Sequence, residues 1–215
     1  MNFKYYKTER LIIFIIALTI VFGTISMIIH HFVSELPDLP KHLILFTDAF
    51  TVPFFIGLIL HFVNNNWWNT KYFTWLIKIP DLNGRYVGTL ESSYQKEGSN
   101  IPVILDCVLE IKQTASSIHI AGYFGNMNQK ILSSSSNSVS EELVLERNGF
   151  FRLYYIFTNE TGGISEQLNN HSGTAKFLYY PDNKTLDGVY YNVIHNHGNI
   201  KVVYSQAKLL GRLNA

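Results

Sequence analysis

The run LIIFIIALTIVFGTISMII, from Leu11 to Ile29, decides how this chain of 215 residues is divided. Its 19 residues carry no charge. A helix rising about 1.5 Å per residue would carry them across the roughly 30 Å hydrocarbon core of a bilayer. A cleaved signal peptide would have a shorter apolar region, followed by a small-x-small cleavage site. The run instead ends in two isoleucines and two histidines, so we expect a retained transmembrane helix.

A second apolar segment, from Leu43 to Val63, has 21 residues and is interrupted by Asp48 and Pro53. Residues 30–42 connect the two segments and are too few to form a domain. We therefore expect residues 1–79 to hold an N-terminal tail, a two-helix transmembrane hairpin (about 11–29 and 43–63) and a juxtamembrane linker.

Basic residues near the two segments predict the orientation of this hairpin, because cytoplasmic loops carry an excess of Lys and Arg. The tail has Lys4, Lys7 and Arg10, and the connecting loop has only Lys41. A multi-pass protein of the cell membrane, with its N-terminus and C-terminal region in the cytoplasm, is the expected arrangement. Aromatic residues after the second segment are typical of a membrane interface: Trp67, Trp68, Tyr72, Phe73 and Trp75.

Asp48 is the one carboxylate inside the second segment. A charged side chain within a membrane helix costs several kcal/mol unless it is protonated, paired or wetted. Two interpretations stay open. Asp48 either lies near the outer interface in an ordinary environment, or it forms an oligomer contact or lines a pore.

Residues 80–215 carry 11 Lys and Arg against 12 Asp and Glu, a formal charge of −1, and they show no sustained helical period. Short runs rich in β-branched and aromatic residues are separated by turn residues instead. This spacing predicts an all-β domain with eight strands, either an up-and-down barrel or a sandwich. The expected strands are 84–94, 103–113, 116–124, 130–139, 150–159, 174–180, 185–193 and 199–206.

Alternation within the strands indicates which side chains face inward. It places Tyr86, Gly88, Leu90 and Ser92 inside the first strand, and Leu186, Gly188, Tyr190 and Asn192 inside the seventh. An eight-stranded barrel either fills with side chains or holds one small ligand. The small and polar members of these sets favour a ligand. The serine-rich run 133–138 is either a flexible linker or a polar strand whose hydroxyls meet that ligand.

The motifs of enzymes, cofactor sites and metal sites are missing from the sequence. It has no G-x-S-x-G, H-E-x-x-H, P-loop or dinucleotide fingerprint. The pair His195-x-His197 has metal-like spacing but no nearby carboxylate or cysteine, and Cys107 is the only cysteine. A net charge of +1 also argues against a nucleic-acid polymer as partner. We expect no catalysis, cofactor or metal.

The layout resembles a known family, the membrane-anchored β-barrel effectors of CBASS, a bacterial anti-phage system. Trp75 to Gly88, WLIKIPDLNGRYVG, is similar to the family's junction pattern I-P-x-L-x-G-x-W/Y-x-G. His171 to Ala175 (HSGTA) is similar to its H-x-G-x-A turn, and Leu186 to Asn192 (LDGVYYN) to its L-x-G-x-Y strand. Tyr86 stands where the family commonly has Trp.

This resemblance implies a compact eight-stranded antiparallel up-and-down barrel at residues 80–215. It also implies that the barrel binds a cyclic dinucleotide made by a partner CD-NTase. Ligand binding would then drive homo-oligomerisation, and the helices would disrupt the inner membrane and kill the infected cell. The alternative function is that of a membrane-tethered barrel that binds a lipid or another hydrophobe. The interior of such a barrel should be almost wholly apolar.

Residue type and alternation nominate five ligand-binding residues. Tyr86 and Tyr190 would stack on bases, Ser135 and Asn192 would donate or accept hydrogen bonds, and Arg152 would meet a phosphate. Asp48 is the candidate for the membrane or oligomer role.

Overall fold

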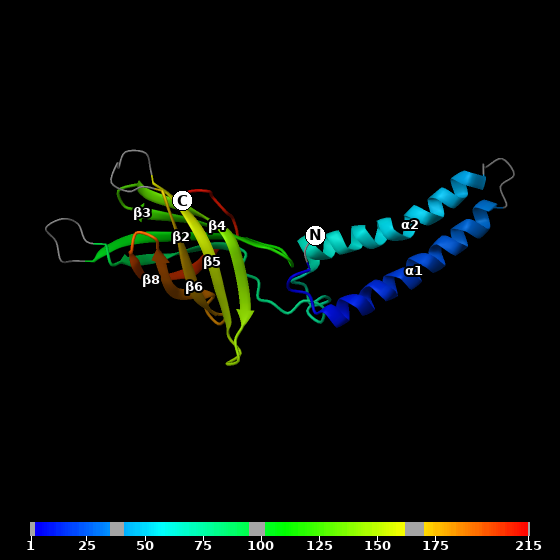
Figure 1. Ribbon diagram of the computed structural model, residues 1–215, viewed down its shortest axis with the longest axis horizontal. Helices are drawn as coiled ribbons and strands as arrows, with labels where there is room; N and C mark the ends of the chain where they lie inside the picture. The colour runs from blue at the N-terminus through cyan, green and yellow to red at the C-terminus, as the bar shows by residue number, and fades with distance from the viewer. Residues whose placement is uncertain (1–2, 35–40, 95–101, 162–169, 215) are drawn as a thin grey trace. The chain divides into compact units, whose positions relative to one another are not determined.

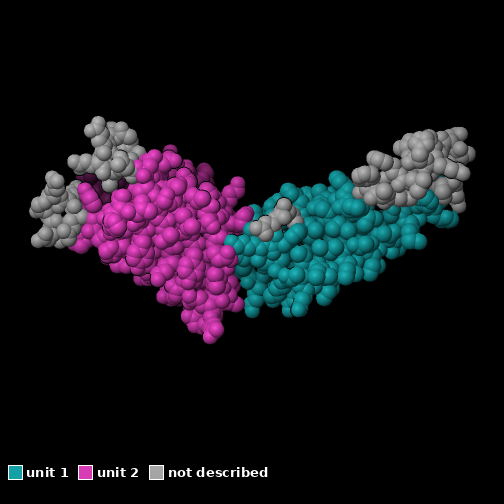
Figure 2. All heavy atoms as spheres, in the orientation of Figure 1, with its two compact units in different colours: residues 1–79, 114–116 teal, residues 80–113, 117–215 magenta. Residues whose placement is uncertain are grey.

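The computed structural model describes residues 3–34, 41–94, 102–161 and 170–214, without the side chains of residues 34, 41–51 and 161. The chain divides into two compact units (Figure 2). The helical unit comprises residues 1–79 and 114–116, and the barrel unit comprises residues 80–113 and 117–215. Asp48 lies in a helix, but its side chain is outside the described part of the chain.

The helical unit is built on α1 (Thr8–Ser34) and α2 (Lys41–Phe62), which run antiparallel and side by side (Figure 1). The rings of Phe22 and Phe55 stack between them, with centroids 5.3 Å apart. Apolar side chains are exposed around α1, among them Ile13, Ile20 and Met27. A helix that is apolar on all faces needs a nonaqueous environment. Among the described residues, the 26-residue helix Thr8–Val33 is the one that is long and apolar enough to cross a membrane.

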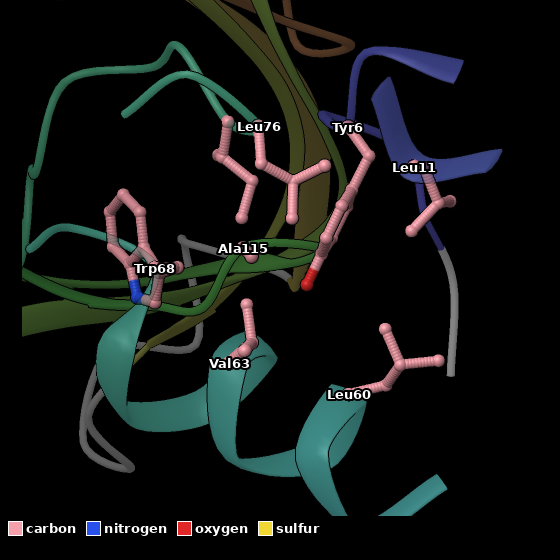
Figure 3. Packing of buried hydrophobic residues seen from close by; sticks show 8 residues of the cluster. Tyr6, Leu11, Leu60, Val63, Trp68, Leu76 and Ala115 are labelled. Atoms are coloured by element: carbon pink, nitrogen blue, oxygen red, sulfur yellow. The ribbon is translucent and has the colours of Figure 1, made fainter. Parts of the chain in front are cut away.

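A small hydrophobic cluster lies at the base of the two helices, next to the π-helical turn η1 (Val63–Trp67) (Figure 3). Its buried members are Tyr6, Leu11, Leu60, Val63, Trp68, Leu76, Ile77 and Ala115. Trp68 is buried here, so the expectation that it belongs to an interfacial aromatic belt was wrong. Trp67, Tyr72 and Trp75 are exposed, as such a belt requires. Burial raises the pKa of Tyr6 in this cluster to about 12.

The barrel unit is a closed sheet of eight strands in sequence order, each antiparallel to its neighbours. The strands are β1 (Gly84–Ser92), β2 (Val103–Gln113), β3 (Ile118–Asn126), β4 (Ile131–Leu145), β5 (Phe151–Thr161), β6 (His171–Tyr180), β7 (Thr185–Asn192) and β8 (His197–Gln206). This confirms the antiparallel eight-stranded barrel. The serine-rich run is part of β4, not a linker. HSGTA begins strand β6, so the prediction of a turn there was wrong.

Large side chains fill one end of the barrel. This closed end lies where β1 begins, and its interior holds Tyr86, Leu109, Leu153, Phe177, Leu186 and Val202, all fully buried. Tyr86 and Leu186 are members of the inward sets that alternation predicts for the first and seventh strands. A filled end leaves only the opposite end of the barrel available for a ligand.

Two glycines of the inward sets make room for backbone, not for a ligand. A Cβ at Gly88 would lie 2.0 Å from the carbonyl oxygen of Lys201 in β8. One at Gly188 would lie 1.9 Å from the carbonyl oxygen of Lys176 in β6. Glycine in a strand interior commonly marks such a close backbone approach. The reasoning that took these glycines as signs of a ligand was therefore wrong.

The C-terminal segment covers part of the outer wall of the barrel. Arg85 and Glu110 are opposite each other on the outer face of β1 and β2, yet both are buried. Arg85 Nη1 donates to Glu110 Oε1 over 2.7 Å and to the carbonyl oxygen of Arg212 over 2.7 Å. Glu110 in turn accepts hydrogen bonds from the backbone amides of Leu210 and Gly211. The segment therefore turns an outward charged pair into an enclosed one.

Candidate ligand-binding cavity

A cavity occupies the open end of the barrel, opposite the closed end. Its volume is about 130 Å³. This value lies below the range of about 300–1,000 Å³ typical of sites that bury most of a drug-sized ligand. The lining comes from all eight strands and the turns beside them: Leu90, Ser92, Tyr94, Val103, Leu105, Phe124, Ser133, Ser134, Ser136, Tyr155, Phe157, Asn159, His171, Tyr190, Asn192, Ile194, Asn196 and Ile200.

Aromatic rings form the inner part of the cavity. Tyr155 stacks on Phe177 of the closed end, with ring centroids 6.0 Å apart and planes 8° apart. The ring centroid of Phe157 lies 6.0 Å from that of Tyr155, and Phe157 also lines the cavity. Burial raises the pKa of the Tyr155 hydroxyl, so this group stays protonated at neutral pH. Flat rings with a neutral hydroxyl suit stacking against a heterocycle.

Tyr190 is fixed in the wall by a hydrogen bond. Its hydroxyl donates to Ser92 Oγ over 2.7 Å, and Ser92 Oγ also accepts from the Tyr94 amide. Burial raises the pKa of Tyr190, and the bond to Ser92 opposes this shift. Asn192 Oδ1 accepts from the Asn196 amide over 2.9 Å. The acceptor of Asn192 is thus occupied, and its amide protons remain for a ligand.

The lining carries no Lys, Arg, Asp or Glu side chain within the described residues, and His171 is its only titratable group besides the tyrosines. The polar contribution comes from hydroxyls and amides of Ser, Tyr and Asn. Such a set hydrogen-bonds neutral polar groups without a net charge of its own.

Of the five nominated residues, the structure brings Tyr190 and Asn192 to the cavity. Tyr86 is fully buried in the closed end. Its ring packs edge-on against Tyr204, with the ring centroids 5.7 Å apart. Its hydroxyl has no hydrogen-bond partner among the described residues. Ser135 is paired with Tyr123 and is not part of the lining, in contrast to Ser134 and Ser136 on either side.

Arg152 lies near the start of β5, at the closed end of the barrel, and does not line the cavity. Its guanidinium forms an ion pair with Glu146, in which Nη2 donates to Oε2 over 3.2 Å. This pairing lowers the pKa of Glu146 through the hydrogen bond from Arg152. The guanidinium is therefore placed against a carboxylate at the end opposite the cavity.

Most of the lining was absent from the sequence-based nomination, including Ser136, Tyr155 and Asn159. Alternation along β5 already places Leu153, Tyr155, Phe157 and Asn159 on one face, and that signal could have found two of them. Ser136 required the pairing of β4 with β3, where it is opposite the inward Gly122.

Comparison with known proteins identifies the family of the domain that contains this cavity. Residues 77–203 match the family described as Cap15, cyclic dinucleotide receptor domain. The chain belongs to this family. All the residues that line the cavity fall within the matched range, so the cavity is part of the Cap15 receptor domain.

A curated relative of the chain is CD-NTase-associated protein 15 from Yersinia aleksiciae, 28% identical over 138 residues. The match covers 64% of this chain and 60% of that protein, so the chain spans less than two thirds of its relative. No solved structure matches the chain.

Proposed function

We propose that the barrel is the sensor of a CBASS effector and binds a cyclic dinucleotide, made by a partner CD-NTase, in the cavity at its open end. The observation that carries this proposal is the coincidence of the cavity with the Cap15 receptor domain. The chemistry of the lining supports it, because rings for stacking lie beside hydroxyls and amides for hydrogen bonding.

The helical unit is the proposed effector part. We infer that α1 and α2 form a hairpin across the bacterial inner membrane, with the N-terminus and the barrel in the cytoplasm. The exposed apolar surface of α1 and its antiparallel packing on α2 support this arrangement. The excess of Lys and Arg in the tail supports the orientation.

Activation then proceeds by a shift of population. A ligand favours the state that binds it better, so the cyclic dinucleotide has to bind the oligomer more tightly than the dispersed protein. Oligomerisation gathers the helices and disrupts the membrane, and the infected cell dies before the phage matures. The chain has no catalytic role in this scheme.

A second candidate is a membrane-tethered barrel for a lipid or another hydrophobe. Apolar side chains in the cavity wall favour it, including Leu105, Phe124 and Ile200. Ser136, Asn159 and the amide protons of Asn192 disfavour it, because a hydrocarbon chain would leave these polar groups without hydrogen bonds.

Thermal unfolding of the full chain in detergent, with and without ligand, separates the two candidates. A ligand at 100 times its Kd stabilises the folded state by about 2.7 kcal/mol, which raises Tm by several degrees. We expect this rise with a cyclic dinucleotide and none with fatty acids. Stabilisation by fatty acids alone would refute the proposed function.

Asn192→Asp tests whether the ligand occupies the cavity. The variant keeps the acceptor that holds the Asn196 amide and adds a negative charge that faces an anionic ligand. We expect more than a tenfold loss of affinity by calorimetric titration. Asn137→Asp places the same charge on an exposed position of β4 and serves as control.

Asp48 is proposed to act in the membrane part alone. Asp48→Ala should weaken killing of cells that co-express the CD-NTase, while the cyclic dinucleotide still raises the Tm of the purified chain. Unchanged killing at equal protein level would contradict this proposal and indicate that Asp48 lies in an ordinary environment near the interface.

A further inference from the structure

We propose that the cavity takes up one nucleobase of the cyclic dinucleotide and leaves both phosphates at the open end, and that Asn159 and Ser136 determine which base is accepted. This inference rests on the proposed function and adds the part of the ligand that enters and the residues that select it.

The size of the cavity limits what can enter. Pockets that enclose a whole drug-sized ligand measure about 300–1,000 Å³. The cavity here has a volume of about 130 Å³. The cavity is therefore too small to enclose a whole cyclic dinucleotide, and we infer that a single base is the part that enters.

The charge of the cavity determines which part enters. A phosphate transferred out of water into an uncharged, largely apolar site is unfavourable unless a cation or several donors replace the water. No lysine or arginine lines the cavity within the described residues. A nucleobase is neutral and polar only at its edges, and it can use the rings of Tyr155 and Phe157 for stacking.

Asn159 and Ser136 form a hydrogen-bonding pair in the right place. They are directly opposite each other on β5 and β4, so their Cβ atoms are about 4.5–5.5 Å apart. Asn159 is 6% exposed and Ser136 is 4% exposed, and both line the cavity. Neither side chain has a hydrogen-bond partner in the described part of the chain, yet neither is sealed off from the cavity.

Polar groups that face the cavity in this way are available for hydrogen bonds with a ligand. An asparagine amide offers a donor and an acceptor side by side, which matches the paired donors and acceptors along the edge of a base. The Ser136 hydroxyl adds a third group that donates or accepts. Gly122 keeps the space open, because a Cβ there would lie 2.5 Å from Ser136 Oγ. Together these groups form hydrogen bonds with the edge of a base and distinguish one base from another.

The test uses the full chain in detergent and cyclic dinucleotides that share one linkage and differ in their bases. Wild type should discriminate among the bases. Asn159→Ala and Ser136→Ala should each reduce the ratio between the best and the worst affinity by about tenfold, the equivalent of one directed hydrogen bond. Asn137→Ala and Ser135→Ala are matched controls beside the cavity lining and should leave the ratio unchanged.

A competition experiment tests the position of the phosphates. One of the four free nucleosides should displace the bound cyclic dinucleotide at millimolar concentration, while ribose 5-phosphate should not. Displacement by ribose 5-phosphate but by no nucleoside would overturn the inference. So would unchanged base discrimination in both cavity variants. Failure of every cyclic dinucleotide to bind wild type would instead refute the proposed function on which the inference rests.

Discussion

At the scale of single residues, the most demanding interaction is the enclosed ion pair between Arg85 and Glu110. Both side chains are 4% exposed, and the pair is 2.7 Å apart. Charges taken out of water destabilise a fold unless their remaining hydrogen-bonding groups are satisfied. The carbonyls of Arg212 and Leu213 and the amides of Leu210 and Gly211 do this.

Removal of one partner should therefore cost far more than removal of both. Arg85→Met leaves Glu110 enclosed without its counter-charge, and we expect a loss of about 3–5 kcal/mol of unfolding free energy. The double variant Arg85→Met, Glu110→Leu should recover most of this loss. Chemical denaturation of the full chain in detergent measures both.

Arg152→Met is the control for this pair, since Arg152 and Glu146 are partly exposed and water can replace the lost partner. Its unfolding midpoint should stay close to wild type. A double variant as unstable as Arg85→Met would contradict the explanation by an unpaired charge.

Two properties of the site residues could not be predicted from the sequence: the register in which neighbouring strands pair, and the position of each side chain along the barrel axis. Alternation found Ser92, Tyr190 and Asn192, because they are inward residues near strand ends. It could not separate Ser135 from Ser136, because their orientation depends on the pairing of β4 with β3. Tyr86 does face inward as expected, but its depth along the barrel axis places it in the closed end.

At the scale of elements, the close contact of β1 with β8 depends on Gly88. A methyl group there would lie 2.0 Å from the Lys201 carbonyl oxygen and 2.8 Å from the Val202 Cα. Backbone atoms of a paired strand cannot rotate away as a side chain can. We expect Gly88→Ala to destabilise the barrel by more than about 3 kcal/mol, or to prevent its folding.

Tm of the full chain in detergent checks this expectation, with expression level as the readout if the variant does not fold. Thr89→Ala, at the exposed neighbouring position, is the control and should change stability by less than about 0.5 kcal/mol. A Gly88→Ala barrel with the stability of wild type would show that the two strands can separate at this point.

The strands themselves were predictable because turn residues and β-branched runs are local signals. Each of the eight overlaps its expected range, although β4 extends to Leu145, six residues beyond the expected end at 139. The packing of the C-terminal segment on the outer wall of the barrel was not predictable, because residues 207–214 have neither strand nor helix periodicity. Their contacts with Arg85 and Glu110 join positions more than 90 residues apart in the chain.

At the scale of the whole molecule, α1 should determine where the protein resides. The exposed apolar side chains near its middle, including Ile16 and Ile20, would face lipid. Lysine at such a position costs about 2.5–3.5 kcal/mol of insertion free energy. We expect wild type to stay in the membrane pellet after an alkaline wash and Ile16→Lys, Ile20→Lys to be partly released.

Ile16→Leu, Ile20→Leu is the matched control and should stay in the pellet. Full retention of the double lysine variant would mean that α1 is dispensable for membrane attachment. The helices were predictable from hydropathy alone, but the burial of Trp68 at their base was not, since it depends on contacts with residues distant in sequence.

Closure of the sheet restricts how copies of this protein can associate. Each strand of the described barrel is bonded on both sides, so there is no unpaired edge to which a strand of another molecule could be added. The described barrels of two copies can therefore meet only through side chains on the wall or at the ends. Contacts of that kind separate when the affinity that sustains them is withdrawn, whereas added or exchanged strands persist. The assembly that we propose should therefore be reversible, and removal of the cyclic dinucleotide by dialysis should return the protein to its dispersed state.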